Sequence, residues 1–170
     1  WLHESFGTNW RMTEMQAVLG RIQLTRMPEW TAKRTANAQA ILDACAKWEG
    51  KGYLSVPRLE ESAQFADSTH AYYKLYVYVQ PDNLPEGWSR DRIIQEINDL
   101  GVPCFSGSAS EVYLEKAFDN TGLRPESRLP VAKQLGETSL MFLVHPTLTE
   151  EEIKQTVQAI DSVFANIHNQ

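Results

Sequence analysis

The residues Tyr72-Tyr73-Lys74-Leu75-Tyr76-Val77-Tyr78-Val79 mark the point at which the apolar pattern of the sequence changes its period. Aromatic and β-branched side chains alternate along them with a period of about two residues, which indicates a β-strand. The apolar residues before and after this stretch recur instead at helical spacing. The stretch therefore predicts one strand of a sheet, lying in the sequence between helices.

Two further short strands are predicted downstream, each next to a helix. Ser89 can cap a helix, and the short apolar run of residues 102–105 follows it as a second strand. Residues 139–144 form a third, after which Thr149 and Glu152 match a capping box that starts the last helix. This order predicts an α/β (α+β) fold, in which a small sheet of three or four strands packs against helices.

A serine-rich run, Ser106-Gly107-Ser108-Ala109-Ser110, lies between the second and third predicted strands. Residues 108–111 match a capping box and predict a short helix through Phe118. Because free amides at a helix start bind anions, the run is either an anion site or an ordinary cap, and the frequency of Ser caps favours the cap. Pro130 suits the first turn of another helix, which we expect to extend to about Leu135.

Upstream of the first strand, the sequence predicts a long helical arm. Residues 13–16 match a capping box that begins a helix. Pro28 is expected to interrupt it, so that Glu29 to Trp48 forms a second, Ala-rich helix. We therefore expect an interface loop and a two-helix arm over residues 1–50, and a C-terminal small α/β domain over residues 51–170.

Composition narrows the class of protein. The chain has 170 residues, of which 42% are hydrophobic and 22% charged, as in ordinary soluble globular domains. Its net charge is −6 and its basic residues are scattered, which argues against a nucleic-acid partner. There is no apolar run long enough to span a membrane. The two cysteines, Cys45 and Cys104, are far apart and favour a reducing cytoplasm.

The short local motifs do not by themselves indicate a catalytic activity. None of the four histidines has a partner at metal-ligand spacing, so we expect no metal site. Nucleophile elbows, phosphate-binding loops and dinucleotide fingerprints are absent from the sequence. The chain opens at Trp1 with neither an initiator Met nor a leader pattern, so we expect it to be a piece of a longer protein.

One long motif is far more specific. Residues Gly7-Thr8-Asn9-Trp10-Arg11-Met12-Thr13-Glu14-Met15-Gln16-Ala17 resemble the DegT-type sugar aminotransferase family, which carries a Gly-x-Asn-aromatic-Arg-Met/Leu-Thr-x-x-Gln-Ala pattern just after its cofactor-binding domain. Later features agree with the family in order, and the resemblance covers essentially the whole chain. These features are Gly20, Gln23-Leu24, Trp30, Arg34, residues 70–77 and residues 143–149.

The resemblance implies the C-terminal part of a fold-type I enzyme that works as a cytoplasmic homodimer with pyridoxal phosphate. Such enzymes usually take an amino group from glutamate and transfer it to a keto group of a nucleotide-linked sugar, often for cell-surface polysaccharide. The family's Schiff-base lysine and the acidic partner of the pyridine nitrogen lie upstream of this chain. We therefore expect no catalytic residue here and an isolated chain that is inactive. The alternative is a non-catalytic dimerisation or ligand-binding module that reuses the fold.

The resemblance also assigns site residues. Asn9 corresponds to the asparagine that reaches the cofactor phosphate of the neighbouring subunit. The alternative is an asparagine that only tolerates turn backbone, and the surrounding motif favours the phosphate role. Arg11 is a candidate for phosphate or substrate carboxylate, or for an ion pair at the dimer interface. Where many relatives carry a His-containing stretch near the sugar, this chain has Ser106 and Ser108, followed by Tyr113. These three are candidate substrate-binding residues, and the departure suggests a different nucleotide sugar.

Overall fold

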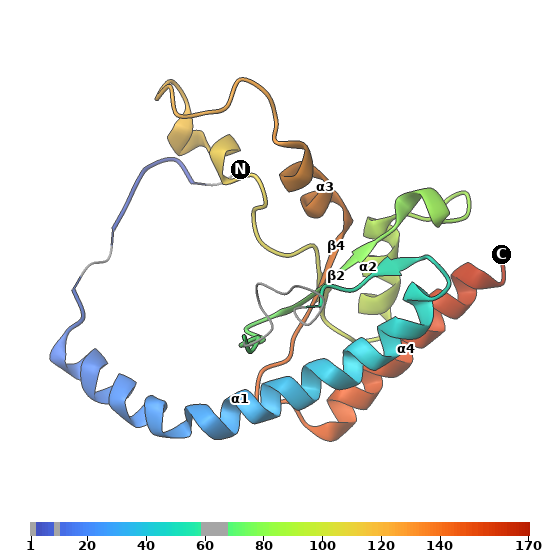
Figure 1. Ribbon diagram of the computed structural model, residues 1–170, viewed down its shortest axis with the longest axis horizontal. Coiled ribbons are helices and arrows are strands. Elements are labelled where there is room, and N and C mark those ends of the chain that lie inside the picture. Colours follow the sequence, from blue (N-terminus) through green and yellow to red (C-terminus); the bar gives the residue numbers. More distant parts are fainter. Residues whose placement is uncertain (1–2, 9–10, 59–67) are drawn as a thin grey trace.

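The computed structural model describes residues 3–8, 11–58 and 68–170. Within these residues, four short strands form a single antiparallel sheet (Figure 1). In their order across the sheet, the strands are β1 (Leu54–Ser55), β2 (Leu75–Val79), β4 (Ser139–Phe142) and β3 (Cys104–Phe105). The sheet confirms the three predicted strands and adds β1, whose two residues are too few to show an apolar alternation.

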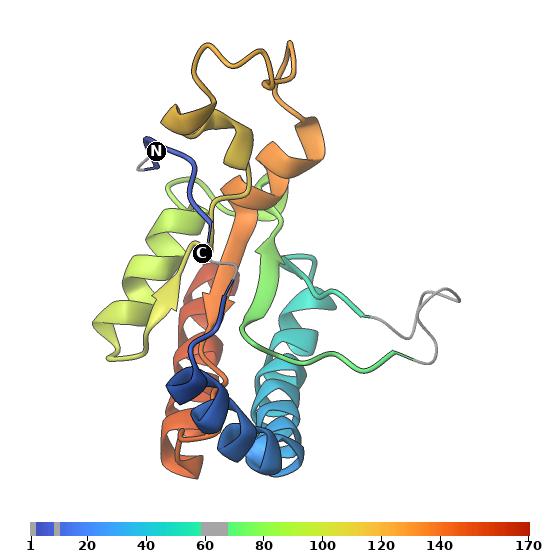
Figure 2. The same ribbon diagram turned by 90° about the vertical axis from the view of Figure 1, so that its left-hand side faces the viewer.

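Helices cover one face of this sheet (Figure 2). The second half of α1 (Glu14–Glu49), α2 (Arg90–Asp99) and α4 (Glu150–His168) supply the apolar side chains of that layer. The remaining described helices are α3 (Pro130–Thr138) and the short 3-10 turns η2 (Pro81–Asn83), η3 (Val112–Leu114) and η4 (Lys116–Phe118). The small α/β fold expected from the sequence is confirmed.

The register of the strands separates the two faces of the sheet. Leu75 of β2 pairs with Phe142 of β4, which pairs with Cys104 of β3, and all three belong to the buried core. Because side chains alternate along a strand, the next residues point to the opposite face. We call that side, opposite the helix layer, the open face. Its residues are Tyr76, Tyr78, Phe105, Ser139 and Met141, of which Ser139 and Met141 are buried.

α1 and α4 lie side by side and run in the same direction. The buried Asn37 side chain donates to the carbonyl of His145 at 3.2 Å, near the start of α4. Near the other end, the Trp48 indole donates to Asp161 at 2.9 Å and stacks on Phe164 with ring centroids 5.9 Å apart. These contacts fix the buried half of α1 on the domain.

The caps at Thr13, Ser89 and Thr149 are as the sequence predicts, and two of them, at Thr13 and Thr149, are complete capping boxes. The predicted break at Pro28 is wrong, because α1 is one helix from Glu14 to Glu49 with Pro28 inside it. The proline leaves the Leu24 carbonyl without an intrahelical donor. Residues 21–29 are exposed, so water can satisfy that carbonyl, and the helix continues.

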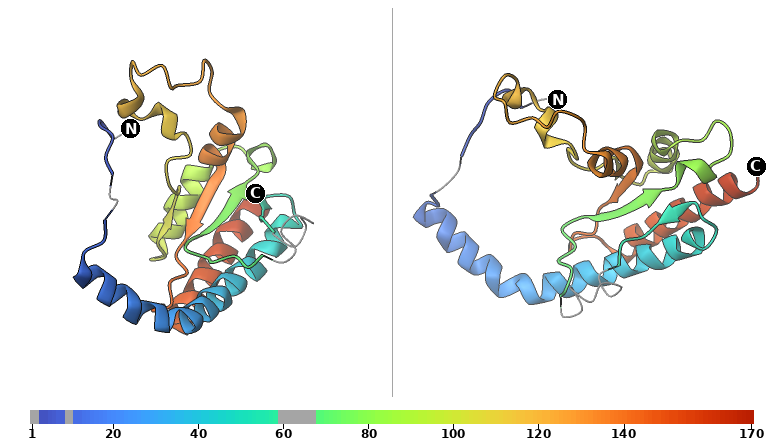
Figure 3. Two further views of the ribbon diagram at one scale, coloured as in Figure 1. Left: turned by 60° about the vertical axis from the view of Figure 1, so that its left-hand side comes forward. Right: turned by 45° about the horizontal axis from the view of Figure 1, so that its top comes forward.

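The first half of α1 leaves the domain (Figure 3). The chain before it returns as residues 3–8, which we call the N-terminal segment, to the turns η3 and η4 at the far end of the sheet (Figure 1). In the described part of the chain, no helix combines the length and the apolar character needed to cross a membrane.

Candidate functional site

A cavity of about 670 Å³ lies at the edge of β2 where β1 gives no cover. β1 pairs only with Tyr78 and Val79, so the edge beside Leu75–Val77 is left open among the described residues. The residues that line the cavity include Tyr76, Tyr78 and Lys74 at this edge, and Gln39 and Asp43 of α1. Hydroxyls and an ammonium can bind a ligand that is rich in hydroxyl groups or carries negative charge.

Ser106, Gly107 and Ser108 bring a loop onto the same open face. The Ser139 hydroxyl donates to the Ser106 carbonyl at 2.6 Å, and the hydroxyls of Ser108 and Tyr76 are 3.5 Å apart. Gly107 has φ +90°, and a Cβ there would lie 2.5 Å from the Tyr76 ring. Only glycine lets the backbone pass this close to the ring. The loop thus places Ser108 next to Tyr76, which lines the cavity, and Ser106 next to Ser139.

The capping box predicted at residues 108–111 is wrong, and so is the helix through Phe118. The chain instead forms η3 and η4, and Glu111 precedes η3 without a side-chain cap. The reason is that the Glu111 carboxylate is already bound by Arg128 and Tyr113, so it does not turn back to Ser108. With no helix starting at Ser108, the anion site that depended on a helix start is not formed there.

Tyr113 lies in a separate network on the far side of this loop. Its hydroxyl donates to Glu111 at 2.6 Å and accepts from the Leu129 amide at 2.8 Å. The hydrogen bond from the Arg128 guanidinium lowers the pKa of Glu111 to about 2. Tyr113 and Glu111 therefore hold the loop after the serine run in place, and Tyr113 is not brought to the cavity.

The N-terminal segment carries the second group of predicted residues. Arg11 is exposed just before α1, and its guanidinium has no hydrogen bond or ion pair with the part of the chain that the structure describes. Asn9 lies outside the described residues. Upstream of it, His3 contacts Glu115 and Ala117, and Phe6 contacts Phe118, so the segment is attached to the domain before Asn9 in the sequence.

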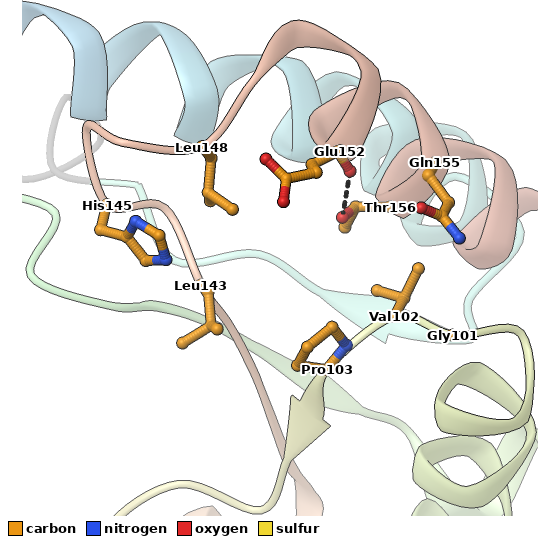
Figure 4. Close-up of a pocket in the computed structure, with 9 residues that line it drawn as sticks. All are labelled: Gly101, Val102, Pro103, Leu143, His145, Leu148, Glu152, Gln155 and Thr156. Carbon is orange, nitrogen blue, oxygen red and sulfur yellow. Dashed lines mark hydrogen bonds between the residues drawn. The ribbon is translucent and has the colours of Figure 1, made fainter.

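A smaller cavity of about 340 Å³ lies between β3 and the start of α4 (Figure 4). Its polar side chains are engaged within the fold. Glu152 caps α4 by accepting from the Thr149 amide at 2.7 Å, and Thr156 donates to the Glu152 carbonyl at 2.9 Å. Gln155 donates to the Leu100 carbonyl at 3.3 Å. This cavity offers fewer free polar groups than the one beside Tyr76.

The sequence analysis did not single out Tyr76 and the Glu111–Arg128 pair. The sequence did contain the information that Tyr76 and Tyr78 point to the same face, because they alternate with the aliphatic residues of the strand. Nothing local pointed to Arg128, which is far from Glu111 in sequence. No lysine of the chain is buried. Among the described residues, no three His, Cys, Asp or Glu side chains form a group that could hold a metal ion.

A model of the DegT/DnrJ/EryC1/StrS aminotransferase family matches residues 1–161. The erythromycin biosynthesis sensory transduction protein EryC1 of Saccharopolyspora erythraea is 30% identical over 167 residues, covering 98% of this chain and 39% of that protein. A dTDP-3-amino-3,4,6-trideoxy-alpha-D-glucose transaminase of Streptomyces venezuelae is 29% identical over 161 residues, covering 95% of this chain and 37% of that protein.

Among solved structures, the aminotransferase from Psychrobacter cryohalolentis superimposes with a TM-score of 0.91. Its sequence is 93% identical to this chain, and the match covers 99% of this chain and 43% of that one. The chain therefore spans about two fifths of the length of the proteins it matches.

Proposed function

This chain belongs to the DegT/DnrJ/EryC1/StrS aminotransferase family, and we propose that it is the C-terminal, substrate-facing part of a sugar aminotransferase. The whole enzyme takes an amino group from glutamate and transfers it to a keto group of a nucleotide-linked sugar. The observation that carries this proposal is the 93% identity to a protein whose structure is that of an aminotransferase. A curated relative named as a sugar-nucleotide transaminase supports the substrate class.

Pyridoxal phosphate is the cofactor of the family. When bound, it supplies the electron sink for moving an amino group, while the protein orients it and handles protons. In this chain, the residues suited to the cofactor are ones that could bind its phosphate group. The Asn9 amide can donate to a phosphate oxygen, and Arg11, two residues further along the sequence, has an exposed guanidinium that offers a charge-assisted donor.

The chain's lysines do not fit the position of the lysine that holds the cofactor. An activated lysine of that kind is typically desolvated, and all seven lysines here are at least partly exposed. Within the part of the chain that the structure describes, four of them are paired with carboxylates. The pairs are Lys47 with Asp161, Lys116 with Glu4, Lys133 with Glu137, and Lys154 with Glu151. We therefore assign the cofactor lysine to the rest of the enzyme and expect the isolated chain to be inactive.

We place the nucleotide-linked sugar against the open face. The hydroxyls of Tyr76 and Ser108 can exchange hydrogen bonds with sugar hydroxyls, and Lys74 can neutralise a phosphate or carboxylate of the substrate. Ser106 supports this surface through its carbonyl, which the Ser139 hydroxyl holds. Tyr113 supports the loop from behind through Glu111.

We further propose that the enzyme is a homodimer in which Asn9 serves the neighbouring subunit. The exposed apolar side chains on the first half of α1 support an interface there. The buried, free thiols of Cys45 and Cys104 fit the reducing cytoplasm that we propose as its location.

The test is amine transfer by the full-length protein. We expect the purified enzyme, loaded with pyridoxal phosphate, to move ¹⁵N from labelled glutamate to a keto sugar linked to a nucleotide. Alanine and glutamine as donors serve as comparisons. Absence of transfer from any donor to a panel of such sugars, by a protein that is folded and binds the cofactor, would contradict the proposal.

A non-catalytic module is the second candidate, because one relative is named as a sensory transduction protein. The reading frame upstream of Trp1 separates the two. A preceding domain with a cofactor lysine supports the enzyme, whereas a stop codon directly upstream supports the module.

A further inference from the structure

The loop that carries Ser106 and Ser108 is exposed, so its position depends on a few specific contacts rather than on burial. Two of these contacts lie at its start. The Ser106 carbonyl accepts from the Ser139 hydroxyl at 2.6 Å, and Gly107 lies against the Tyr76 ring. The loop is therefore fixed to β4 and to β2 before it reaches Ser108.

A third contact, between Ser110 and Gly136 of α3, lies at the end of the loop. A Cβ at Gly136 would lie 2.0 Å from the Ser110 Oγ and 2.9 Å from its Cβ. Rotation moves the hydroxyl, but the Cβ is fixed to the backbone of the loop. Glycine therefore lets α3 and the loop approach each other this closely. Because α3 ends at Thr138 and β4 begins at Ser139, two of the three supports belong to one stretch, residues 136–139, which we call the α3–β4 junction (Figure 1).

Arg90, the first residue of α2, binds this junction. Its Nη1 donates to the carbonyls of Gly136 at 3.0 Å and Ser139 at 3.2 Å. The Arg90 side chain is only 16% exposed. Because a largely buried charge is costly without partners, the positions of Arg90 and of the junction depend on each other. Asp91, which also accepts from Arg90, is exposed and contributes little.

The two residues that Arg90 holds by their carbonyls are the same two that support the loop. Gly136 supports it through its lack of a side chain, and Ser139 supports it through its hydroxyl. Ser108 lies between the two supported positions in the sequence, and its hydroxyl is 3.5 Å from that of Tyr76. A shift of the junction therefore moves both ends of the loop and Ser108 with them.

We propose that Arg90 is a positioning residue for sugar recognition, which acts through the α3–β4 junction to hold Ser108 next to Tyr76 on the open face. This inference rests on the proposed function. It adds a side chain of α2 to the residues that determine how the sugar binds.

The test uses variants of the full-length enzyme. Arg90→Ala removes both hydrogen bonds to the junction. Arg90→Lys keeps the charge but lacks the planar fork of donors, so it restores the contact only in part. Arg92→Ala is the matched control, because it removes a guanidinium from the same helix that contacts Gly87, Trp88 and Glu96.

Gly136→Ala tests the same junction from its other side. Alanine is favourable in the interior of a helix, so the substitution does not weaken α3 through helix propensity. Its Cβ must nevertheless displace Ser110. This variant separates the position of the loop from the stability of the fold, and it decides the question if Arg90→Ala does not fold.

Two readouts are compared for each variant. The first is the dissociation constant of dTDP-glucose and of UDP-glucose, which are nucleotide-linked sugars without a keto group. The second is the apparent KM of glutamate in its half-reaction with the enzyme, followed by the absorbance of the cofactor. The urea midpoint of unfolding reports whether the variant is folded.

We expect Arg90→Ala and Gly136→Ala to weaken binding of the nucleotide sugar by about tenfold, the loss of roughly one hydrogen bond's worth of affinity. Arg90→Lys should fall between Arg90→Ala and wild type, and Arg92→Ala should match wild type. The KM of glutamate should stay unchanged in all four variants. Unchanged sugar binding in either folded variant would overturn the proposal, and so would an equal loss for the sugar and for glutamate.

The positioning role and the proposed function fail in different ways. A wild-type enzyme that transfers amine to a keto sugar, together with an Arg90→Ala variant that binds nucleotide sugars normally, would contradict the positioning role alone. A wild-type enzyme that binds the cofactor but transfers no amine would contradict the proposed function. Binding of neither dTDP-glucose nor UDP-glucose by the wild type would overturn the placement of the sugar and the role of Arg90 with it.

Discussion

Glu111 is a buried carboxylate with one partner close to it in sequence and one distant from it. Arg128 forms an ion pair with it, and the Tyr113 hydroxyl donates to it at 2.6 Å. The hydrogen bond from Arg128 is the largest cause of its lowered pKa, which is about 2 instead of 4.5. A carboxyl with a lowered folded-state pKa stabilises the fold fully above its unfolded pKa. That contribution is lost as the pH falls from about 4.5 towards 2.

The first prediction follows from the stabilisation that ionised Glu111 gives to the folded state. Glu111→Gln should lower the urea midpoint of unfolding at pH 7, because Arg128 loses its charged partner. At pH 3 the difference between wild type and variant should be smaller, since the wild-type carboxyl is by then losing its advantage. Glu126→Gln, an exposed carboxylate in the same loop, should match wild type at both values. An equal difference at pH 7 and pH 3 would show that the Glu111 charge does not stabilise the loop.

Gly107 is constrained both by its positive φ and by its contact with the Tyr76 ring, and comparison with Gly122 separates the two effects. Both have a positive φ, of +90° and +73°, but only Gly107 faces the Tyr76 ring. Gly122→Ala should cost about 1 kcal/mol from the left-handed backbone alone. Gly107→Ala should cost more, and it should move Ser108 away from Tyr76. Denaturant unfolding of the two variants measures the difference, and equal costs would mean that the loop does not pack on the ring as described.

At the scale of elements, the sequence predicted the features that depend on neighbours in the chain. The caps at Thr13, Ser89 and Thr149 are local hydrogen bonds, and all three are present. Pro28 was misread because its effect depends on whether the freed carbonyl meets water. The box at Ser108 was misread because Arg128, distant in sequence, binds the glutamate that the box required.

The candidate site was predictable to a similar extent. Ser106 and Ser108 were singled out; Ser108 lies next to Tyr76, which lines the cavity, but neither serine lines it, and their substrate-binding role stays a prediction. The alternation of β2 contained the information that Tyr76 faces away from the core. Its meeting with Ser108 required the path of the loop through Gly107, which no spacing in the sequence encodes. Asn9 remains a prediction, as does the sugar-binding role of Tyr113.

The first half of α1 presents large apolar side chains without cover from the described domain. Met15 is 79% exposed, and Leu19 is 59% exposed. A contiguous patch of this kind promotes association. We predict that the isolated 170-residue chain forms dimers or larger species in light scattering, and that Leu19→Lys shifts it towards monomer. Arg21→Gln, exposed on the same helix, should leave the distribution unchanged. A clean monomer of the unmodified chain at high concentration would contradict this prediction.

At the scale of the whole molecule, the account depends on three features: the open face of the sheet, the arm of α1 and the N-terminal segment. The helix-covered sheet presents a polar open face with a cavity beside Tyr76, and the long arm of α1 extends away from it (Figure 3). The N-terminal segment, which precedes that arm, contacts Glu115 and the turn η4. In a homodimer of the proposed enzyme, this arrangement lets one chain supply a sugar-facing surface and a phosphate-binding segment.

The central claim is that the segment of Asn9 completes the cofactor site of the neighbouring subunit. In the full-length enzyme, Asn9→Ala removes one hydrogen bond to a charged phosphate, which should weaken cofactor binding by about ten- to a hundredfold. Subunits carrying Asn9→Ala are mixed with subunits that lack the cofactor lysine, and transamination by the verified hybrid dimers is measured. If Asn9 acts across the interface, one site of each hybrid has both defects and the other has neither, so activity returns to about half of wild type. If Asn9 serves its own subunit, every site keeps one defect, and hybrids without recovered activity would contradict the account.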